Sequence, residues 1–138
     1  MHRIASPATD DNSIEAEIQS KGLNAPRITP KDIESIIASE HYFTAAQGVF
    51  GASMDIDGTT PRLDGGSLEL LTFCVLALRN GFTVTGESAC ASPENFDADI
   101  GRKIARQNAV NKIWPLLGYQ LRETLWQRSQ TGCGYQSC

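Results

Sequence analysis

The feature that most constrains the fold is a long apolar run followed by a turn dipeptide and a second extended segment. Residues 68–79, LELLTFCVLALR, are apolar on both alternating sets of positions, which is typical of a central strand covered on both faces. Asn80-Gly81 favours the positive φ angles of a type I′ turn, and residues 82–85, FTVT, follow as a partner strand. We therefore predict a β-hairpin here.

Two helices are predicted before this hairpin. Thr29 and Asp32 have the spacing of a capping box, Pro30 suits the first helical position, and residues 28 and 33 are placed for a hydrophobic staple. Isoleucines at positions 33, 36 and 37 continue the pattern, so the helix is expected from Pro30 to about His41. A shorter helix is expected over residues 13–18, with Ser13 as its cap and a glycine at position 22 after its last turn.

The segment between the helix and the hairpin contains three turn signals. These are Gly48, Asp57-Gly58 and the glycine pair that follows Asp64. Between them, residues 49–56 predict a short strand.

A long helix is predicted after the hairpin, because Ser92 can cap and Pro93 suits the first helical position. The apolar residues form two rows at helical spacing, which predicts a helix lying across a sheet. The rows are Phe96, Ile100 and Ile104, and Ala109, Ile113 and Leu116. Pro115 predicts a kink or break near Trp114.

Gly118-Tyr119 is expected to end that helix, and residues 121–126 form a further helical stretch before the pattern is lost. Together these elements predict an α+β fold. A small antiparallel β-meander with the Asn80-Gly81 hairpin packs against an N-terminal helix and a longer C-terminal helix. We expect a flexible segment over residues 1–27, one domain over 28–126 and a flexible tail over 127–138.

Composition narrows the class of protein. The 138 residues carry 12 basic and 16 acidic side chains, so the net charge of −4 argues against a duplex-DNA binder. No window approaches the roughly 18–20 consecutive apolar residues of a membrane span. The first residues lack the apolar block of a secretory signal. We expect a soluble protein of the cytoplasm.

Cysteine and histidine give little sign of metal or catalytic chemistry. The spacing of Cys74, Cys90, Cys133 and Cys138 matches no zinc pattern, and no histidine accompanies any of them. His41 is expected at the end of a helix, where the helix dipole accounts for it. We expect no catalytic residues, no metal and no cofactor, and therefore no enzyme.

One motif opposes that expectation. Residues 55–60, DIDGTT, match the nucleophile motif of haloacid-dehalogenase-type phosphatases, in which Asp55 would attack a phosphate and Asp57 would act as acid and base with magnesium. The preceding segment is a poor buried strand, and the following pattern is a hairpin with helices. An Asp-Gly turn is the alternative explanation.

A group of basic residues on the second helix suggests a ligand site. Arg102 and Arg106 lie one turn apart, and the free amides of a helix beginning near Ser92 favour an anion. Asn95 could hydrogen-bond a base or a sugar, and Phe82 could stack on a base. These residues would suit a small anionic nucleotide. The alternative is a solvated face of mixed charge.

Residues 71–90, LTFCVLALRNGFTVTGESAC, continue into PENFD at 93–97, IGRKIA at 100–105 and AVNKIW at 109–114. These segments resemble the phage "gene 49 / gene 66" family of small accessory proteins from tailed phages and prophages. The resemblance extends over roughly residues 28–125, and it implies a bacterial host. The hairpin-then-helix block also shows a more distant similarity to phage sponge proteins that sequester nucleotide immune signals.

The leading hypothesis is a non-enzymatic phage accessory protein that sequesters a small anionic nucleotide-like ligand, as in counter-defence. A homo-oligomer is expected, because a doubly apolar strand in a small sheet needs cover. No duplex DNA and no membrane are expected as partners. One alternative is a protein–protein interaction module acting on a host or phage protein. The other is the metal-dependent phosphatase through Asp55 and Asp57.

Overall fold

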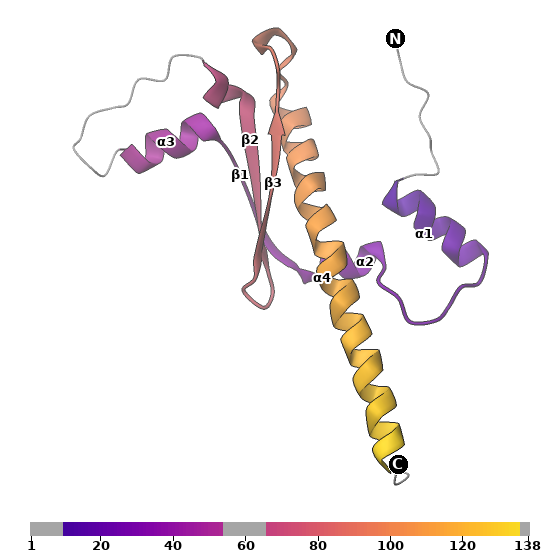
Figure 1. The fold of residues 1–138 in the computed structure, drawn as a ribbon. Coiled ribbons are helices and arrows are strands. Elements are labelled where there is room, and N and C mark those ends of the chain that lie inside the picture. Colours follow the sequence, from indigo (N-terminus) through magenta and orange to yellow (C-terminus); the bar gives the residue numbers. More distant parts are fainter. Residues whose placement is uncertain (1–9, 54–65, 136–138) are drawn as a thin grey trace. The chain divides into compact units, whose positions relative to one another are not determined.

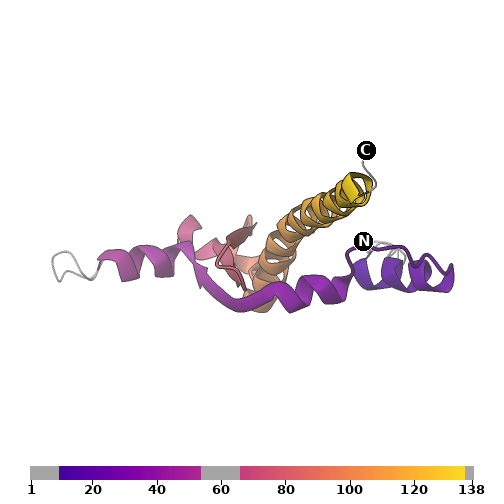
Figure 2. The same cartoon turned by 90° about the horizontal axis from the view of Figure 1, so that it is seen from below.

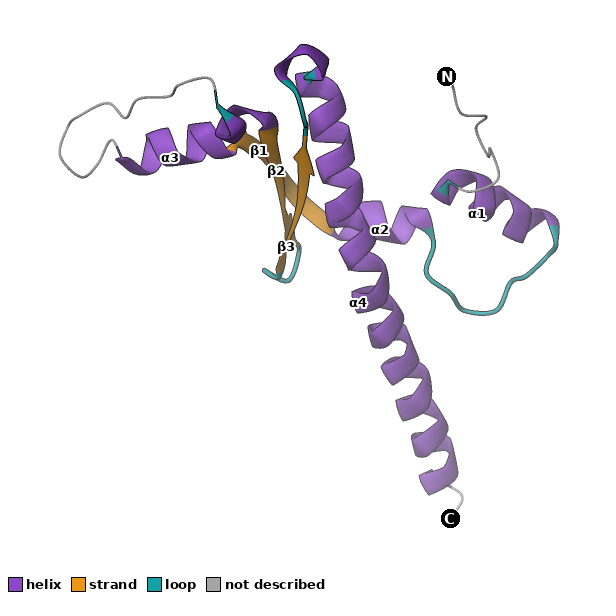
Figure 3. Cartoon of the chain, turned by 45° about the horizontal axis from the view of Figure 1, so that its top comes forward, coloured by secondary structure: helices purple, strands orange, loops and turns teal. Residues whose placement is uncertain are grey.

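A computed structural model of the chain describes residues 10–53 and 66–135 (Figure 1). The described elements, in chain order, are α1 (Asp11–Ser20), α2 (Pro30–Ile36), β1 (Ile37–Thr44), α3 (Ala45–Ser53), η2 (Ser67–Leu70), β2 (Leu71–Leu78), β3 (Thr83–Ala89), η3 (Pro93–Asn95) and α4 (Ala98–Tyr135). The fold is α+β, as predicted: a three-stranded antiparallel meander packs against the long C-terminal helix, and further helices precede the sheet (Figure 3). No helix in the described ranges is long and apolar enough to cross a membrane.

The chain divides into two compact units. One is Ile36–Ile113, which contains the whole sheet and the first part of α4. The other combines the residues up to Ser35 with those from Trp114 onward, so α4 contributes to both units.

In the sheet unit, β2 is the central strand, with β1 and β3 as antiparallel neighbours. Its residues alternate strictly between buried and half-buried, and the buried set is Thr72, Cys74, Leu76 and Leu78. The N-terminal part of α4 covers that face (Figures 1 and 2). A Cβ built on Gly86, which pairs with Cys74, would lie 2.1 Å from the carbonyl oxygen of Ala105. The prediction of a central strand is confirmed; within the described chain one face of β2 is buried and the other is half-buried.

The hairpin is confirmed, with a loop one residue longer than a type I′ turn. The amide of Leu78 donates to the carbonyl of Phe82 at 2.8 Å, and Gly81 donates back to the Leu78 carbonyl at 2.9 Å. Gly81 has φ +91°, and the amide of Phe82 donates to Asn80 Oδ1 at 3.0 Å. This is the arrangement of a three-residue loop with glycine in the left-handed position. The turn type differs because the asparagine side chain bonds to the loop backbone.

The helix predicted up to His41 ends at Ile36, and Ile37–Thr44 is strand β1. Its start is as predicted: Thr29 and Asp32 form a reciprocal capping box, with N···O distances of 2.9 and 3.2 Å. Pairing with β2 explains the difference, because β1 supplies backbone partners for one whole edge of the central strand. Tertiary pairing here overrides local helix propensity.

The segment after β1 is helical, so the predicted turn at Gly48 and the first residues of the predicted strand 49–56 are wrong. Helix α3 begins with its own capping box: Thr44 N donates to Gln47 Oε1 at 2.9 Å, and Gln47 N donates to Thr44 Oγ1 at 3.1 Å. The remainder of that predicted strand lies outside the described residues, as does the Asp57-Gly58 turn. The predicted strand start at Leu68 is wrong as well, because a 3-10 turn occupies residues 67–70.

Helix α4 begins at Ala98, six residues after the predicted cap at Ser92. Ser92 and Pro93 open only the short η3, and Asp97 Oδ1 accepts the amide of Ile100 at 3.0 Å at the true helix start. The buried face of α4 also differs from the first predicted row. Ile100 and Ile104 are 56% and 47% exposed, whereas the small residues Ala105 and Ala109 are fully buried. Close approach of the helix to the sheet selects small side chains on this face.

Of the kink or break predicted near Trp114, the break is wrong, and so is the predicted stop at Gly118-Tyr119, since α4 continues to Tyr135 with Pro115 inside it. A proline in a helix interior removes one amide donor and costs about 3 kcal/mol. The many other backbone hydrogen bonds of so long a helix offset that cost. Helix α1 begins at Asp11 rather than Ser13, because Asp10 is its cap and accepts the Ser13 amide at 2.7 Å.

Candidate ligand site

A cleft of about 360 Å³ opens in the sheet unit, at the end of the sheet where β1 ends and β2 begins. We call it the Arg102 cleft. The residues that line it are Tyr42, Phe43, Thr44, Gln47, Thr72, Phe96, Ala98 and Arg102. They come from β1, α3, β2, the segment after η3, and the first turns of α4.

The α3 capping box fixes the polar wall of the cleft. Because Gln47 Oε1 accepts the Thr44 amide, the carboxamide is oriented, and its Nε2 donor has no partner among the described residues. Thr72, on the other wall, is buried at the base of β2. Its Oγ1 would lie 3.1 Å from a Cβ built on Gly101, so glycine in α4 keeps the helix close to this strand.

Two phenylalanines, Phe43 and Phe96, are among the residues that line the cleft. Phe43 is 37% exposed, and its ring stacks on Phe73 with centroids 5.5 Å apart and planes at 28°. Phe96 is half-buried immediately before α4. Because Phe73 is on the face of β2 opposite to Thr72, the Phe43 ring lies on that opposite face, and Phe96 is the phenylalanine that can offer its ring to a planar group in the cleft.

Arg102 supplies the positive charge. Its Nη2 bonds to Asp99 one turn earlier, and the side chains of the two residues are 44% and 77% exposed. A pair this exposed contributes little free energy, about 0–1 kcal/mol, so an anionic ligand can compete for the guanidinium.

Arg106 has a different role from Arg102. Its Nη2 and Nε bond to Glu40 on β1 at 2.9 and 3.2 Å, and Tyr42 donates to the same carboxylate at 2.8 Å. The hydrogen bonds from Arg106 hold the pKa of Glu40 below its ordinary value. Burial, together with this bond to Glu40, raises the pKa of Tyr42. Arg106 thus ties α4 to an edge strand.

The structure does not bring the five sequence-predicted ligand residues together. Phe82 lies beside Leu78, at the opposite end of β2 from Thr72, a separation of about 20 Å along a strand. Ser92 and Asn95 lie at η3, where the Asn95 amide donates to the Ser92 carbonyl at 3.2 Å. The long helix expected to start near Ser92, on whose free amides the predicted anion site depended, starts instead at Ala98 beside the Asp97 carboxylate.

The surroundings of the other candidate residues, as far as the structure describes them, do not indicate a catalytic or metal-binding role. His41 is on β1, with Nε2 3.1 Å from Ser39 Oγ, so its expected place at a helix end is wrong. Burial raises the pKa of the Cys74 thiol. Within residues 10–53 and 66–135, no group of three or more His, Cys, Asp or Glu side chains could hold a metal. The Asp55–Asp57 motif lies outside the described residues.

Sequence reasoning missed Thr44 and Gln47. The signal was present, because Thr44-Ala45-Ala46-Gln47 has the T-x-x-Q spacing of a capping box. The glycine at position 48 favours a turn, and this hides the capping-box spacing.

Comparison with known protein families identifies the family of the chain. Residues 28–125 match the Phage protein (N4 Gp49/phage Sf6 gene 66) family. The chain belongs to this family. The match contains the whole sheet and the Arg102 cleft, and it confirms the resemblance to the gene 49 / gene 66 proteins. Comparison with curated proteins and with solved structures gave no match.

Proposed function

We propose that this member of the Gp49/gene 66 family is a non-enzymatic binding module that sequesters a small anionic nucleotide-like ligand in the Arg102 cleft. The observation that carries the proposal is the combination of the Arg102 guanidinium, the Phe96 side chain and an oriented amide donor around one cavity. Its volume, about 360 Å³, lies in the range of small-molecule sites.

Each wall suits one part of such a ligand. Arg102 can bind a phosphate through two parallel N–H···O bonds, which a lysine could not provide. Phe96 offers a surface on which a base can stack, an interaction worth about 1–3 kcal/mol per base. Gln47 Nε2 can donate to a ring nitrogen or a carbonyl. The interactions proposed here are hydrogen bonds and stacking, and they involve no nucleophile and no metal. They therefore support binding of a ligand rather than its chemical conversion.

The test is isothermal titration of the full chain with a panel of mononucleotides, cyclic nucleotides and ADP-ribose-type nucleotides. Arg102→Gln is expected to weaken the best ligand at least about tenfold, because it removes a charge-assisted pair. Lys103→Gln is the matched control: it removes the same charge at the next position, which is exposed and outside the cleft. Equal affinities for Arg102→Gln and wild type would refute the site.

A substitution of Arg106 is not suitable for this binding test. Removing it leaves Glu40 without its cation and loosens the contact between α4 and β1. We expect Arg106→Gln to lower the free energy of unfolding, whatever it does to binding.

A second observation favours an oligomer. The face of β2 away from the buried set is half-buried, and it carries Leu71, Phe73, Val75 and Ala77. We propose that a second copy of the chain covers this apolar strip. The molar mass measured by light scattering should then be a multiple of 15.0 kDa, and Val75→Asp should lower that molar mass toward the value of the monomer. A wild-type monomer that captures one stoichiometric protein from infected cells would instead favour the interaction-module hypothesis.

A further inference from the structure

A second cavity, of about 270 Å³, lies within the other unit, and the proposed function does not use it. We call it the α1 cavity. The residues that line it are Asp11, Ile14, Glu15, Ile18, Ile28, Pro30 and Trp114. The wall is therefore mainly apolar, with acidic groups on one side.

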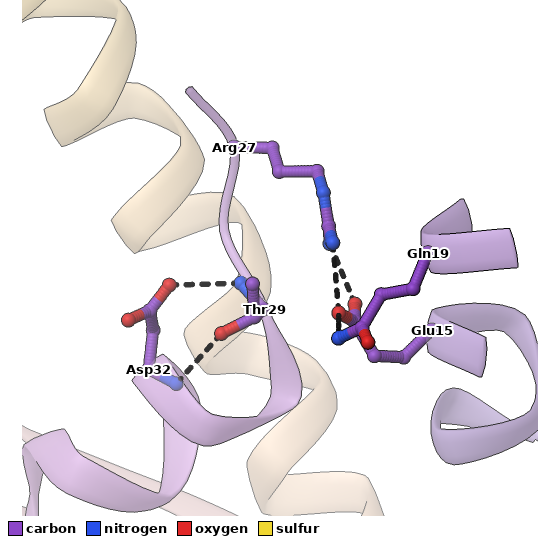
Figure 4. Close-up of polar contacts among 5 residues, drawn as sticks. All are labelled: Glu15, Gln19, Arg27, Thr29 and Asp32. Carbon is purple, nitrogen blue, oxygen red and sulfur yellow. Dashed lines mark hydrogen bonds and ion pairs between the residues drawn. The ribbon is translucent and has the colours of Figure 1, made fainter. Parts of the chain in front are cut away.

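A network of polar contacts holds α1 beside this cavity (Figure 4). Glu15 accepts two bonds from Arg27, at 2.5 and 2.8 Å, and a third from Gln19 Nε2 at 2.8 Å. These bonds lower the pKa of Glu15 to about 2, so it is ionised throughout the neutral range. The Thr29–Asp32 capping box then fixes the course of the chain along the cavity.

The apolar side of α1 is only partly covered by other parts of the described chain. No residue of α1 is buried, and Ile14 is 43% exposed although it faces a cavity lined by Trp114 and Ile18. An amphipathic helix normally buries this stripe. The contact area that remains is therefore available to a ligand.

The two carboxylates differ in whether a cationic side chain pairs with them. Arg27 compensates Glu15, whereas Asp11 has no ion-pair or side-chain hydrogen-bond partner among the described residues. Asp11 stabilises the N-terminus of α1 through the helix dipole. No side-chain cation among the described residues pairs with Asp11, and this residue lines an apolar cavity that also includes Trp114, a combination that favours a cation.

We propose that the α1 cavity binds a small amphiphilic cation, in which a compact apolar group contacts Ile14, Ile18 and Trp114 while an ammonium group pairs with Asp11. Its cavity volume is at the small end of ligand sites, which suits a group the size of one aromatic side chain. Helix α1 precedes residues 28–125, so this site includes an element outside the family match.

The test uses the full chain and three probes of one shape: 2-phenylethylammonium, 2-phenylethanol and phenylacetate. The chain has two tryptophans, so the Trp126→Phe variant leaves Trp114 fluorescence as the reporter. The ammonium probe should bind about fivefold more tightly than the alcohol, as one partly exposed ion pair allows, and the carboxylate most weakly. Equal affinities of the ammonium and the alcohol, or no response of Trp114, would overturn the proposal.

Two variants separate the charge from the fold. Asp11→Asn should abolish the preference for the ammonium probe while the affinity for the alcohol stays unchanged. Glu17→Gln is the control, because Glu17 is on the same helix, pairs with Lys21 at 2.8 Å and lies outside the cavity. If Glu17→Gln reduced the preference as much as Asp11→Asn, the effect would be the general charge of α1 and the site would be refuted. Neither result depends on the Arg102 cleft.

Discussion

The contact between β3 and α4 gives the sharpest structural prediction, the effect of Gly86→Ala. An alanine Cβ at this position would lie 2.1 Å from the carbonyl oxygen of Ala105 and 2.3 Å from the amide nitrogen of Ala109. Both neighbours are helix backbone, so no side-chain rotation can relieve the clash. The helix must move away from the sheet.

Overpacking of a core costs about 1–3 kcal/mol when side chains can adjust. Since backbone must shift here, Gly86→Ala should lower the free energy of unfolding by at least about 3 kcal/mol. Gly101→Ala should cost much less, because its Cβ would meet the rotatable Thr72 hydroxyl at 3.1 Å. Gly51→Ala, with nothing within 4 Å in helix α3, should stabilise by about 0.5–1 kcal/mol.

Urea unfolding followed by far-UV circular dichroism would rank the three variants, with the slope of each transition checked against wild type. The packing argument predicts the midpoint order Gly51→Ala, then Gly101→Ala, then Gly86→Ala. A Gly86→Ala midpoint equal to that of wild type would show that α4 does not approach β3 at backbone distance.

Three further predictions address other parts of the chain. Leu76→Ala should cost about 2–5 kcal/mol by urea unfolding, because the side chain is fully buried in the central strand. Thr29→Ala should cost about 1 kcal/mol through loss of its cap, and Thr29→Ser should restore most of it. The Glu15 pKa, about 2 against an ordinary 4.5, is lower in the folded state, so its contribution is present above pH 4.5 and lost as the pH falls from 4.5 toward 2. Thermal melts in this range should show that slope for wild type and a weaker one for Glu15→Gln.

The elements that the sequence predicted best are those fixed by local chemistry. The Thr29–Asp32 capping box and the Gly81 hairpin both form from residues adjacent in sequence. The long helix was also predicted, although its start was placed at Ser92 because Ser-Pro is a strong local signal. Asp97 is an equally good cap, and only the chain's path from β3 decides between them.

The missed elements depend on pairing between distant residues. Ile37 continues the apolar helical stripe of residues 33 and 36, yet residues 37–44 form a strand because the other edge of β2 needs hydrogen-bonding partners. The buried face of α4 was misassigned for a related reason. Ala105 and Ala109 carry less apolar area than Ile100 and Ile104, yet they face the sheet because Gly86 admits the helix so closely.

The candidate site was predictable only in part. Arg102 and the idea of an anionic ligand followed from the basic residues on one helix. Arg106 looked equivalent, but its partner Glu40 is 66 residues away in the chain. The Thr44–Gln47 capping box has a local sequence signal, but its place near Thr72 depends on the position of α3 beside β2, which no local pattern reveals.

Native mass spectrometry of the purified chain with the nucleotide panel tests the central claim most directly. Ligand binding in the Arg102 cleft predicts a stoichiometric mass shift with one nucleotide class for wild type and Lys103→Gln, and a much weaker shift for Arg102→Gln. No shift with any nucleotide, or an equal shift for Arg102→Gln, would contradict it.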